Sequence, residues 1–244
     1  MNGFQALYRR ELAAYFSTPL AYLFLIIFLV LSGAFGFWLG GFYERNQADL
    51  SPFFMFHPWL YLMLVPAVSM RLWAEERHTG SIELLLTLPI STATAVLAKF
   101  FAAWTFIGLA LALTFPTWLT VNYLGHPDNG AILASYLGSF ILAGSYLAIG
   151  SALSANTRSQ VIAFISSVTV CLLLLLAGQP LVLDACRAWL PNPLVDAISA
   201  ISLLSHFQAI QRGVLDLRDL IYFALTMGTW LWATTVVIDH QQAD

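Results

Sequence analysis

The sequence predicts an all-α integral membrane protein with six transmembrane helices. The first observation is composition: the chain of 244 residues is 59% hydrophobic and only 9% charged, with a mean hydropathy of +0.78. Soluble domains carry about 25% charged residues, so most of this chain is expected to lie in lipid. The second observation is a series of apolar segments, each long enough to cross a bilayer as a helix of about 20 residues. The third is the distribution of Lys and Arg, which gives these segments a common orientation.

We interpret the chain, 1–244, as a single transmembrane domain. An interfacial elbow helix, 1–18, is expected on the cytoplasmic leaflet because Arg9, Arg10 and Glu11 occupy one side and mostly aromatic and Leu residues the other. The alternative is that this stretch simply extends the first span. The predicted membrane spans are 20–42, 53–73, 93–124, 132–153, 159–178 and 217–238.

Small residues in two of these spans predict close helix packing. Ser32, Gly36 and Gly40 recur every four residues in the first span, which is a spacing that lets helix backbones approach. The fourth span carries two such rows, which are Ser135, Ser139 and Ala143, and Gly144, Ala148 and Ala152. Near the inner end of the third span, Lys99 is expected to snorkel toward the polar surface.

The linker 74–91 between the second and third spans predicts a short amphipathic helix outside the bilayer. Gly80 allows a chain reversal, and Ser81 occupies a position suited to an N-cap. Glu83 in the first turn is favoured by the helix dipole, and Pro89 ends the helix. The apolar residues of this helix are Ile82, Leu84, Leu85, Leu86 and Leu88. Such a helix can dock into a groove of another protein and transmit its motion to the spans on either side.

This linker, AEERHTGSIELLLTLPIS, resembles the cytosolic coupling segment of ABC-2 type exporter permeases, whose pattern is E-R-x-x-G-T-x-E-x-L-x-x-x-P. The alternative is an ordinary polar loop with one helical turn. Ser81 stands where the pattern has Thr, and its hydroxyl is kept. The resemblance implies that this segment contacts a partner ATPase through the following coupling residues: Glu75, Glu76, Arg77, Gly80, Ser81, Glu83, Leu85 and Pro89.

The segment 180–216, between the fifth and sixth spans, is too apolar for a solvated loop. We expect short helices that dip into the outer leaflet or cap the bundle, with Asp216 capping the last span. The sequence SLLSHFQAIQRGVLDLRDLIYFALT also resembles the last outer segment of gliding-motility GldF-like permeases. The residues that carry this resemblance are Ser205, His206, Phe207, Gly213, Asp216, Arg218, Asp219 and Tyr222.

Lys and Arg predict that both termini are cytoplasmic. When the long outer segment is left aside, the outer side carries Arg45 alone. The inner side carries Arg9, Arg10, Arg71, Arg77, Lys99 and Arg158. The resemblance adds the bacterial inner membrane as the expected location.

The sequence lacks several kinds of catalytic or ligand-binding motif. It contains no Walker A, H-E-x-x-H or nucleophile-elbow pattern, so the chain is not expected to be an enzyme. Its net charge of −3 does not suggest nucleic acid as a partner. No metal site is expected, because the five histidines are scattered without ligand spacing: His57, His78, His126, His206 and His240. Almost no ionisable side chain lies deep in the spans, which argues against proton-coupled transport.

The resemblance implies the permease subunit of an ATP-driven exporter. A separate cytosolic ABC ATPase would bind ATP and Mg²⁺, so that this chain needs no cofactor of its own. The other partners would be the lipid bilayer and a second permease, either another copy or a different subunit. The substrate is unidentified and is expected to be hydrophobic or amphipathic. Two alternatives are a membrane scaffold of a motility or envelope machine that transports nothing, and an energy-independent channel or carrier.

Overall fold

The computed structural model describes residues 3–45, 47–87 and 89–242, with backbone only at 20, 84–86 and 242. The described residues are 82% helical and contain no strand. The helices are α1 (Gly3–Ser17), α2 (Pro19–Ala34) with a π-helical extension (Phe35–Leu39), α3 (Ser51–Met55), α4 (His57–Ser69), α5 (Arg71–Thr79), α6 (Ser81–Leu86), α7 (Thr92–Ala112), α8 (Phe115–Leu124), α9 (Asn129–Ala155), α10 (Gln160–Leu176), α11 (Pro180–Arg187), α12 (Asn192–Ala200), α13 (Leu203–Gln211) and α14 (Leu217–Gln242).

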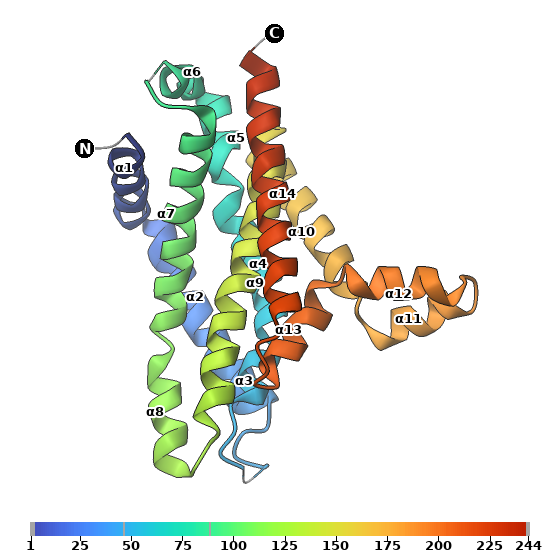
Figure 1. Ribbon diagram of the computed structural model, residues 1–244. Helices are drawn as coiled ribbons and strands as arrows, with labels where there is room; N and C mark the ends of the chain where they lie inside the picture. The colour runs from blue at the N-terminus through green and yellow to red at the C-terminus, as the bar shows by residue number, and fades with distance from the viewer. Residues whose placement is uncertain (1–2, 46, 88, 243–244) are drawn as a thin grey trace.

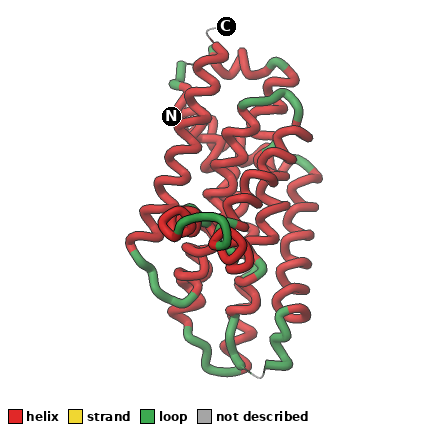
Figure 2. The backbone as a smooth tube through the Cα atoms, turned by 90° about the vertical axis from the view of Figure 1, so that its right-hand side faces the viewer, coloured by secondary structure: helices red, strands yellow, loops and turns green. Residues whose placement is uncertain are grey.

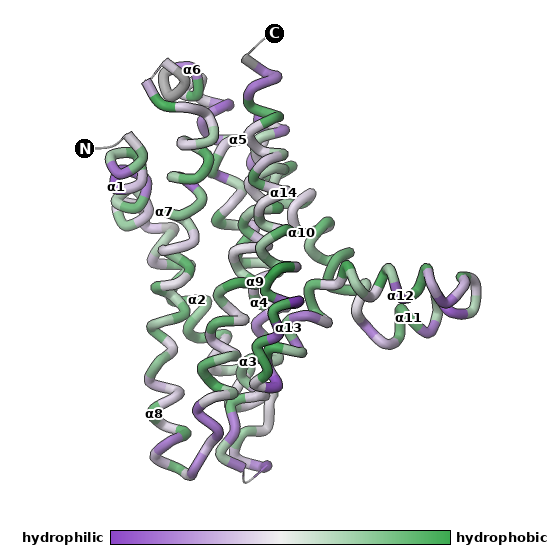
Figure 3. The backbone as a smooth tube through the Cα atoms, in the orientation of Figure 1, coloured by the Kyte–Doolittle hydropathy of each residue, from purple (hydrophilic) through white to green (hydrophobic). Residues whose placement is uncertain are grey.

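The long helices form an elongated bundle with two polar ends (Figure 1). Helix α6 and both ends of the described chain lie toward one end, and α3 and the turn after α8 lie toward the other. Hydrophilic residues gather at the two ends, with others around α13 and along α11 and α12, and hydrophobic residues predominate in the band between the ends (Figure 3). Helices α11 and α12 project sideways from this bundle and point at the viewer in Figure 2.

Among the described residues, four helices are long and apolar enough to cross a membrane. They are Ala21–Leu39, Thr92–Leu124, Asn129–Ala155 and Leu217–Gln241. Two bent helix pairs raise this number to six if each pair is one span: α10 with α11, bent by 72°, and α12 with α13, bent by 66°. An all-helical membrane fold is therefore confirmed, whereas the exact layout of six spans stays a prediction.

The predicted second span, 53–73, differs most from the structure. It is divided among α3, α4 and α5, with breaks at Phe56 and Met70. Pro58 is the second residue of α4, and its missing N–H costs no hydrogen bond there. N–H groups in the first turn of a helix have no partner within the helix. The break at Met70 matters more, since it separates the apolar α4 from the polar α5.

Helix α9 is the centre of the bundle. It contacts α4, α5, α7, α10, α13 and α14. The hydroxyl of its Ser139 is hydrogen-bonded to the side chains of His57 and Tyr61 of α4. The two predicted rows of small residues are largely or fully buried in these contacts. In the first span, Gly36 and Gly40 likewise lie against Phe53 and Pro52, so both predictions of close packing are confirmed.

The outer segment divides into two parts. Helix α13 packs against α9, with Leu203, Phe207 and Ile210 buried, as expected for a helix that enters the bundle. The hairpin of α11, α12 and the turn between them instead leaves large apolar side chains exposed, with Leu181 of α11 at 83% and Trp189 of the turn at 90%.

We predict that Gly150→Ala destabilises the bundle by about 1–3 kcal/mol, because overpacking a core costs this much. A Cβ atom at this position of α9 would lie 2.6 Å from Cβ of Ser69 and closer still to its hydroxyl. Gly228→Ala is the matched control, since a Cβ there meets nothing within 4 Å. Thermal unfolding in detergent should show a lower midpoint for Gly150→Ala alone; equal midpoints would contradict the close α4–α9 contact.

Candidate coupling site

Two short helices, α5 and α6, make a tight reversal at one end of the bundle. Gly80 ends α5 with φ of +73°, a left-handed conformation that favours glycine. Ser81 begins α6 as its first helical residue, one position inside the predicted cap, and its hydroxyl lies 3.0 Å from that of Thr79. Glu83 is exposed in the first turn of α6. The reversal thus presents a carboxylate at the surface.

Ser154 of α9 stabilises the break between α4 and α5. Its hydroxyl accepts hydrogen bonds from the backbone N–H groups of Trp73 (3.2 Å) and Ala74 (3.0 Å) and donates one to the carbonyl oxygen of Met70 (2.9 Å). N–H groups in the first turn of a helix have no partner within that helix, so this hydroxyl takes the place of a cap. The Trp73 indole N–H also donates to Ser151, at 3.1 Å. Helix α5 is therefore attached to α9 as well as to α4.

Arg77 makes a third contact between α5 and the end of α9. Its guanidinium donates to the carbonyl oxygen of Ala155 at 2.5 Å, which is one of the carbonyls left free at a helix C-terminus. Burial, and then the nearby charge of Arg158, lower the pKa of Arg77. Arg77 stays charged at neutral pH because an arginine pKa lies so far above 7.

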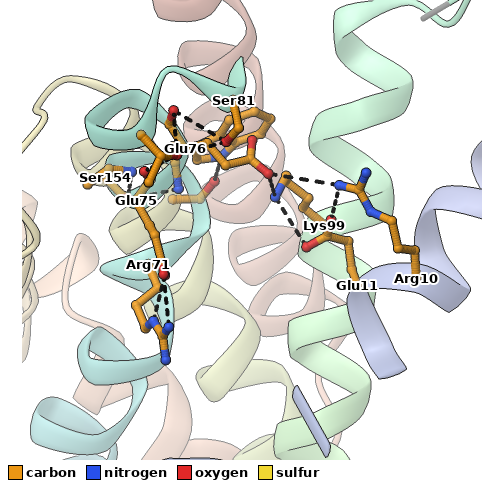
Figure 4. A network of polar contacts seen from close by, with 12 residues as sticks. Arg10, Glu11, Arg71, Glu75, Glu76, Ser81, Lys99 and Ser154 are labelled. Atoms are coloured by element: carbon orange, nitrogen blue, oxygen red, sulfur yellow. Dashed lines mark hydrogen bonds and ion pairs between the residues drawn. The ribbon is translucent and has the colours of Figure 1, made fainter. Parts of the chain in front are cut away.

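An ion-pair network joins α5 to α1 and α7 (Figure 4). The Lys99 ammonium, 3% exposed, lies 2.7 Å from Glu76 Oε1 and 3.2 Å from Glu11 Oε2. Arg10 pairs with Glu11 at 2.7 Å and reaches Glu76 at 4.0 Å. The ammonium also lies 5.3 Å from the ring centroid of Trp73, within the range of a cation–π contact. Three helices therefore meet at one buried cation.

The pKa values of two carboxyl groups reflect these pairs. For Glu11, burial alone would raise the pKa, but the charge of Lys99 and hydrogen bonds from Arg10 and Lys99 outweigh it and the pKa is lowered. For Glu75, a bidentate hydrogen bond from Arg71, at 2.7 and 3.0 Å, lowers the pKa. Both groups are therefore ionised at neutral pH, and both pairs are lost only in acid.

The predicted coupling residues occupy different surroundings. Glu76 was predicted to face a partner protein, but its side chain is 16% exposed and faces Lys99. Lys99 was predicted to snorkel to the polar surface, and it is buried between two carboxylates instead. The side chain of Leu85 lies outside the described part of the chain. Pro89 is exposed in the bend that leads to α7.

Sequence reasoning missed the roles of Glu11, which pairs with the Lys99 that binds α5, and of Ser154, which binds α5 directly. A signal for Glu11 was present: Lys99 is a lone cation in an apolar span, and such a group needs a carboxylate from elsewhere. No comparable signal marked Ser154, because serine is common in closely packed membrane helices.

A partly open cavity of about 650 Å³ lies between α1, α2, α4, α5 and α7. One end of the cavity is apolar and is lined by residues such as Phe24, Ile27 and Ala67. Its other end carries six charged side chains, which are Arg10, Glu11, Arg71, Glu75, Glu76 and Lys99. The cavity thus adjoins the ion-pair network and is itself amphipathic.

Three of the residues that resemble a GldF-like outer segment, His206, Asp219 and Tyr222, form a second polar cluster at the start of α14. His206 pairs with Asp219 at 2.6 Å and donates through Nε2 to the carbonyl oxygen of Ala200 at 3.0 Å. The Tyr222 ring stacks on the imidazole with centroids 3.9 Å apart, and its hydroxyl donates to the carbonyl oxygen of Ile201. The cluster therefore fastens the α12–α13 connection to α14.

The other residues of this segment have separate places. Asp216 accepts a hydrogen bond from the Arg218 backbone N–H, which confirms the predicted cap. Gly213 has φ of +85° in the turn before it, Phe207 is fully buried, and the Arg218 side chain is exposed. No group of three His, Cys, Asp or Glu residues in the described part of the chain is arranged to hold a metal ion.

We predict that Lys99→Met lowers the free energy of unfolding by about 3 kcal/mol, because it leaves the largely buried Glu76 without its close cation and Glu11 with Arg10 alone. Arg187→Met is the control: the Arg187–Asp184 pair is exposed and is expected to contribute about 1 kcal/mol at most. Unfolding in detergent distinguishes the two, and similar losses for both variants would show that the network is not stabilising.

Comparison with known families agrees with this geometry. No curated protein matches the sequence significantly. Residues 43–238, most of the chain, match the profile of a family described as ABC-2 family transporter protein. Permeases of this family are normally non-catalytic and work with an ATPase in a separate subunit. A multi-pass helical bundle with an α5–α6 reversal at one end fits this description, and the chain belongs to the ABC-2 family of transporter proteins.

Proposed function

We propose that the chain is the transmembrane subunit of an ATP-driven exporter of the GldF-like group. The observation that carries this proposal is the family match over residues 43–238, which includes the whole α5–α6 reversal. A cytosolic ABC ATPase would bind ATP and Mg²⁺ and dock on this reversal. A second permease, identical or different, would complete the pathway in the bilayer.

The surface for the ATPase is the end of the bundle that carries α6. Glu83 is exposed there, whereas Glu75 and Glu76 are engaged by Arg71 and Lys99. We therefore assign the contact with the ATPase to Glu83, and we assign to Glu76 the task of holding α5 in place.

Movement of the ATPase would reach the membrane helices through α5. This helix is attached to α9 by Ser154 and Arg77, and to α7 and α1 by the Lys99 network. A push on α6 would therefore shift several helices together as a rigid body and switch access to a central pathway.

The orientation and cargo follow from the same proposal. Both described chain ends lie toward the α6 end of the bundle, so a cytosolic ATPase at α6 implies cytoplasmic termini (Figure 1). The membrane proposed, from the GldF-like resemblance, is the bacterial inner membrane.

An amphipathic or hydrophobic cargo is proposed because ionisable side chains are almost absent from the interior of the spans.

The alternative function is a membrane scaffold or assembly subunit without transport. The projecting hairpin of α11 and α12 favours it, since exposed Leu181 and Trp189 could hold another component of an envelope machine. Substrate movement during ATP turnover separates the two functions.

We predict that Glu83→Lys abolishes the ATPase activity that the permease stimulates in its partner, because it reverses the charge exposed on α6. Glu44→Lys, another exposed charge reversal, in the loop that leads to α3 at the end of the bundle opposite to α6, should leave stimulation intact. The measurement is ATP turnover by the co-purified complex in nanodiscs. Normal stimulation in Glu83→Lys would refute the assignment of the docking surface.

We predict that Ser154→Ala uncouples ATP turnover from transport, because α5 loses the hydroxyl that fastens it to α9. Ser166→Ala is the control, since among the described residues that hydroxyl bonds only to carbonyl oxygens of its own helix α10. The ratio of substrate moved to ATP hydrolysed should fall several-fold in Ser154→Ala only. An unchanged ratio would mean that motion reaches the membrane without this attachment.

A further inference from the structure

A second cavity lies where the π-helical extension of α2 leads into the loop to α3, at the end of the bundle opposite to α6 (Figure 1). Its volume of about 330 Å³ is at the lower end of the range of small-molecule sites. Three aromatic side chains, a glycine and one carboxylate line it, and these are Phe37, Trp38, Tyr43, Gly41 and Glu44. An aromatic belt at a membrane surface requires neither a cavity nor a carboxylate, so membrane anchoring alone does not explain this combination.

The aromatic side chains are carried by a well-supported turn. The Gly40 N–H donates to the carbonyl oxygen of Phe35 at 2.7 Å, which is the hydrogen bond of a π-helix, and π-helical turns are frequent at functional sites. The buried Phe42 packs edge-on against Phe37 and against Tyr43, with ring centroids 5.3 Å apart in both pairs. Part of the aromatic lining is therefore fixed before any ligand binds.

The charge of this cavity comes from Glu44. Its Oε2 atom would lie 3.6 Å from a Cβ atom added at Gly41, so the carboxylate lies beside the turn that lines the cavity. Gly41 has φ of +60°, a conformation that favours glycine. Among the described residues, no cationic side chain forms an ion pair with Glu44, not even the neighbouring Arg45. The cavity therefore offers an unpaired negative charge.

These features together favour one class of cation. Aromatic rings attract cations to their faces, and cages of such rings bind quaternary ammonium groups. A divalent metal ion would need several oxygen ligands, and Glu44 is the only carboxylate of the lining. A primary ammonium or a guanidinium would bring several N–H donors, for which an aromatic lining has few acceptors. A quaternary ammonium has no N–H group, so a carboxylate and aromatic faces are sufficient for it.

We propose that this cavity binds a quaternary ammonium group, held by the aromatic rings of Trp38 and Tyr43 and by the carboxylate of Glu44. The group belongs either to a phospholipid headgroup or to a free compound, because both carry the same trimethylated cation. The site goes beyond the exporter function proposed above, since it is remote from the docking surface at α6 and binding needs no ATP. Glu44→Lys should therefore remove this binding and still leave ATPase stimulation intact.

The test is saturation-transfer NMR of ligand protons with the purified full-length chain in maltoside micelles, which contain no ammonium group. Choline should bind about tenfold more tightly than dimethylbutanol, its uncharged isostere. It should also bind more tightly than ethanolamine, whose ammonium carries N–H groups in place of methyl groups. Equal binding of choline and the uncharged isostere, or tighter binding of ethanolamine, would overturn the proposal.

Two variants with matched controls place the binding. Trp38→Leu removes an aromatic ring and Glu44→Gln removes the charge, and each should weaken choline binding about fivefold. Trp189→Leu is the control for the ring, because Trp189 is 90% exposed and Trp38 is 86% exposed. Glu83→Gln is the control for the charge, because Glu83 is an exposed carboxylate at the other end of the bundle. Equal choline binding by a variant and its control would show that the cation lies elsewhere.

A competition experiment distinguishes the two sources of the cation. Phosphatidylcholine is added to the micelles, with phosphatidylglycerol of identical acyl chains as the control. Displacement of choline by phosphatidylcholine alone identifies a lipid headgroup, and displacement by neither lipid identifies a free compound. Equal displacement by both lipids would mean that acyl chains occupy the cavity, which contradicts the proposal. Because no ATPase takes part, failure here leaves the exporter proposal standing, and failure of the Glu83→Lys prediction leaves this one standing.

Discussion

The structure depends on how one buried ammonium is neutralised. Lys99 lies on an apolar helix, and a cation in such surroundings needs carboxylates close by. Glu11 and Glu76 provide them from α1 and α5, so a single electrostatic requirement determines where three helices meet. Helix α1, the α5–α6 reversal and the long helices of the bundle are joined at this point. The adjoining cavity inherits its charged end from the same network.

Helix α9 supplies a second constraint, which is steric rather than electrostatic. Its small residues let α4 approach until Gly150 touches Ser69, and its hydroxyl groups then bind α4 and α5 at two levels, through Ser139 and Ser154. Close packing and hydrogen bonding depend on each other here, because a serine reaches a neighbouring backbone only where helices are close. The result is a rigid centre against which the outer helices can move.

Composition and segment length were enough to predict an all-helical membrane fold, and small-residue spacing predicted the contacts of Gly36 and Gly40. The chain reversal predicted at Gly80 is also confirmed, since this residue has a left-handed conformation. What could not be predicted was the set of tertiary contacts between residues that are distant in the sequence. The direction in which Glu76 points depends on Lys99, 23 residues later, and on a helix that precedes both. The break at Met70 was hidden because its cap comes from another helix.

The hydrogen bonds from the start of α5 to Ser154 can form only late in biosynthesis. Trp73 and Ser154 are 81 residues apart, so the N–H groups at the start of α5 are synthesised long before their acceptor exists. At translation rates of about 5–20 residues per second, the delay is roughly 4–16 seconds. During this interval the first turn of α5 lacks the acceptor that Ser154 supplies, and the Lys99 network is the attachment of α5 that can form first. The start of the α5–α6 reversal therefore takes its final form only after α9 has been synthesised.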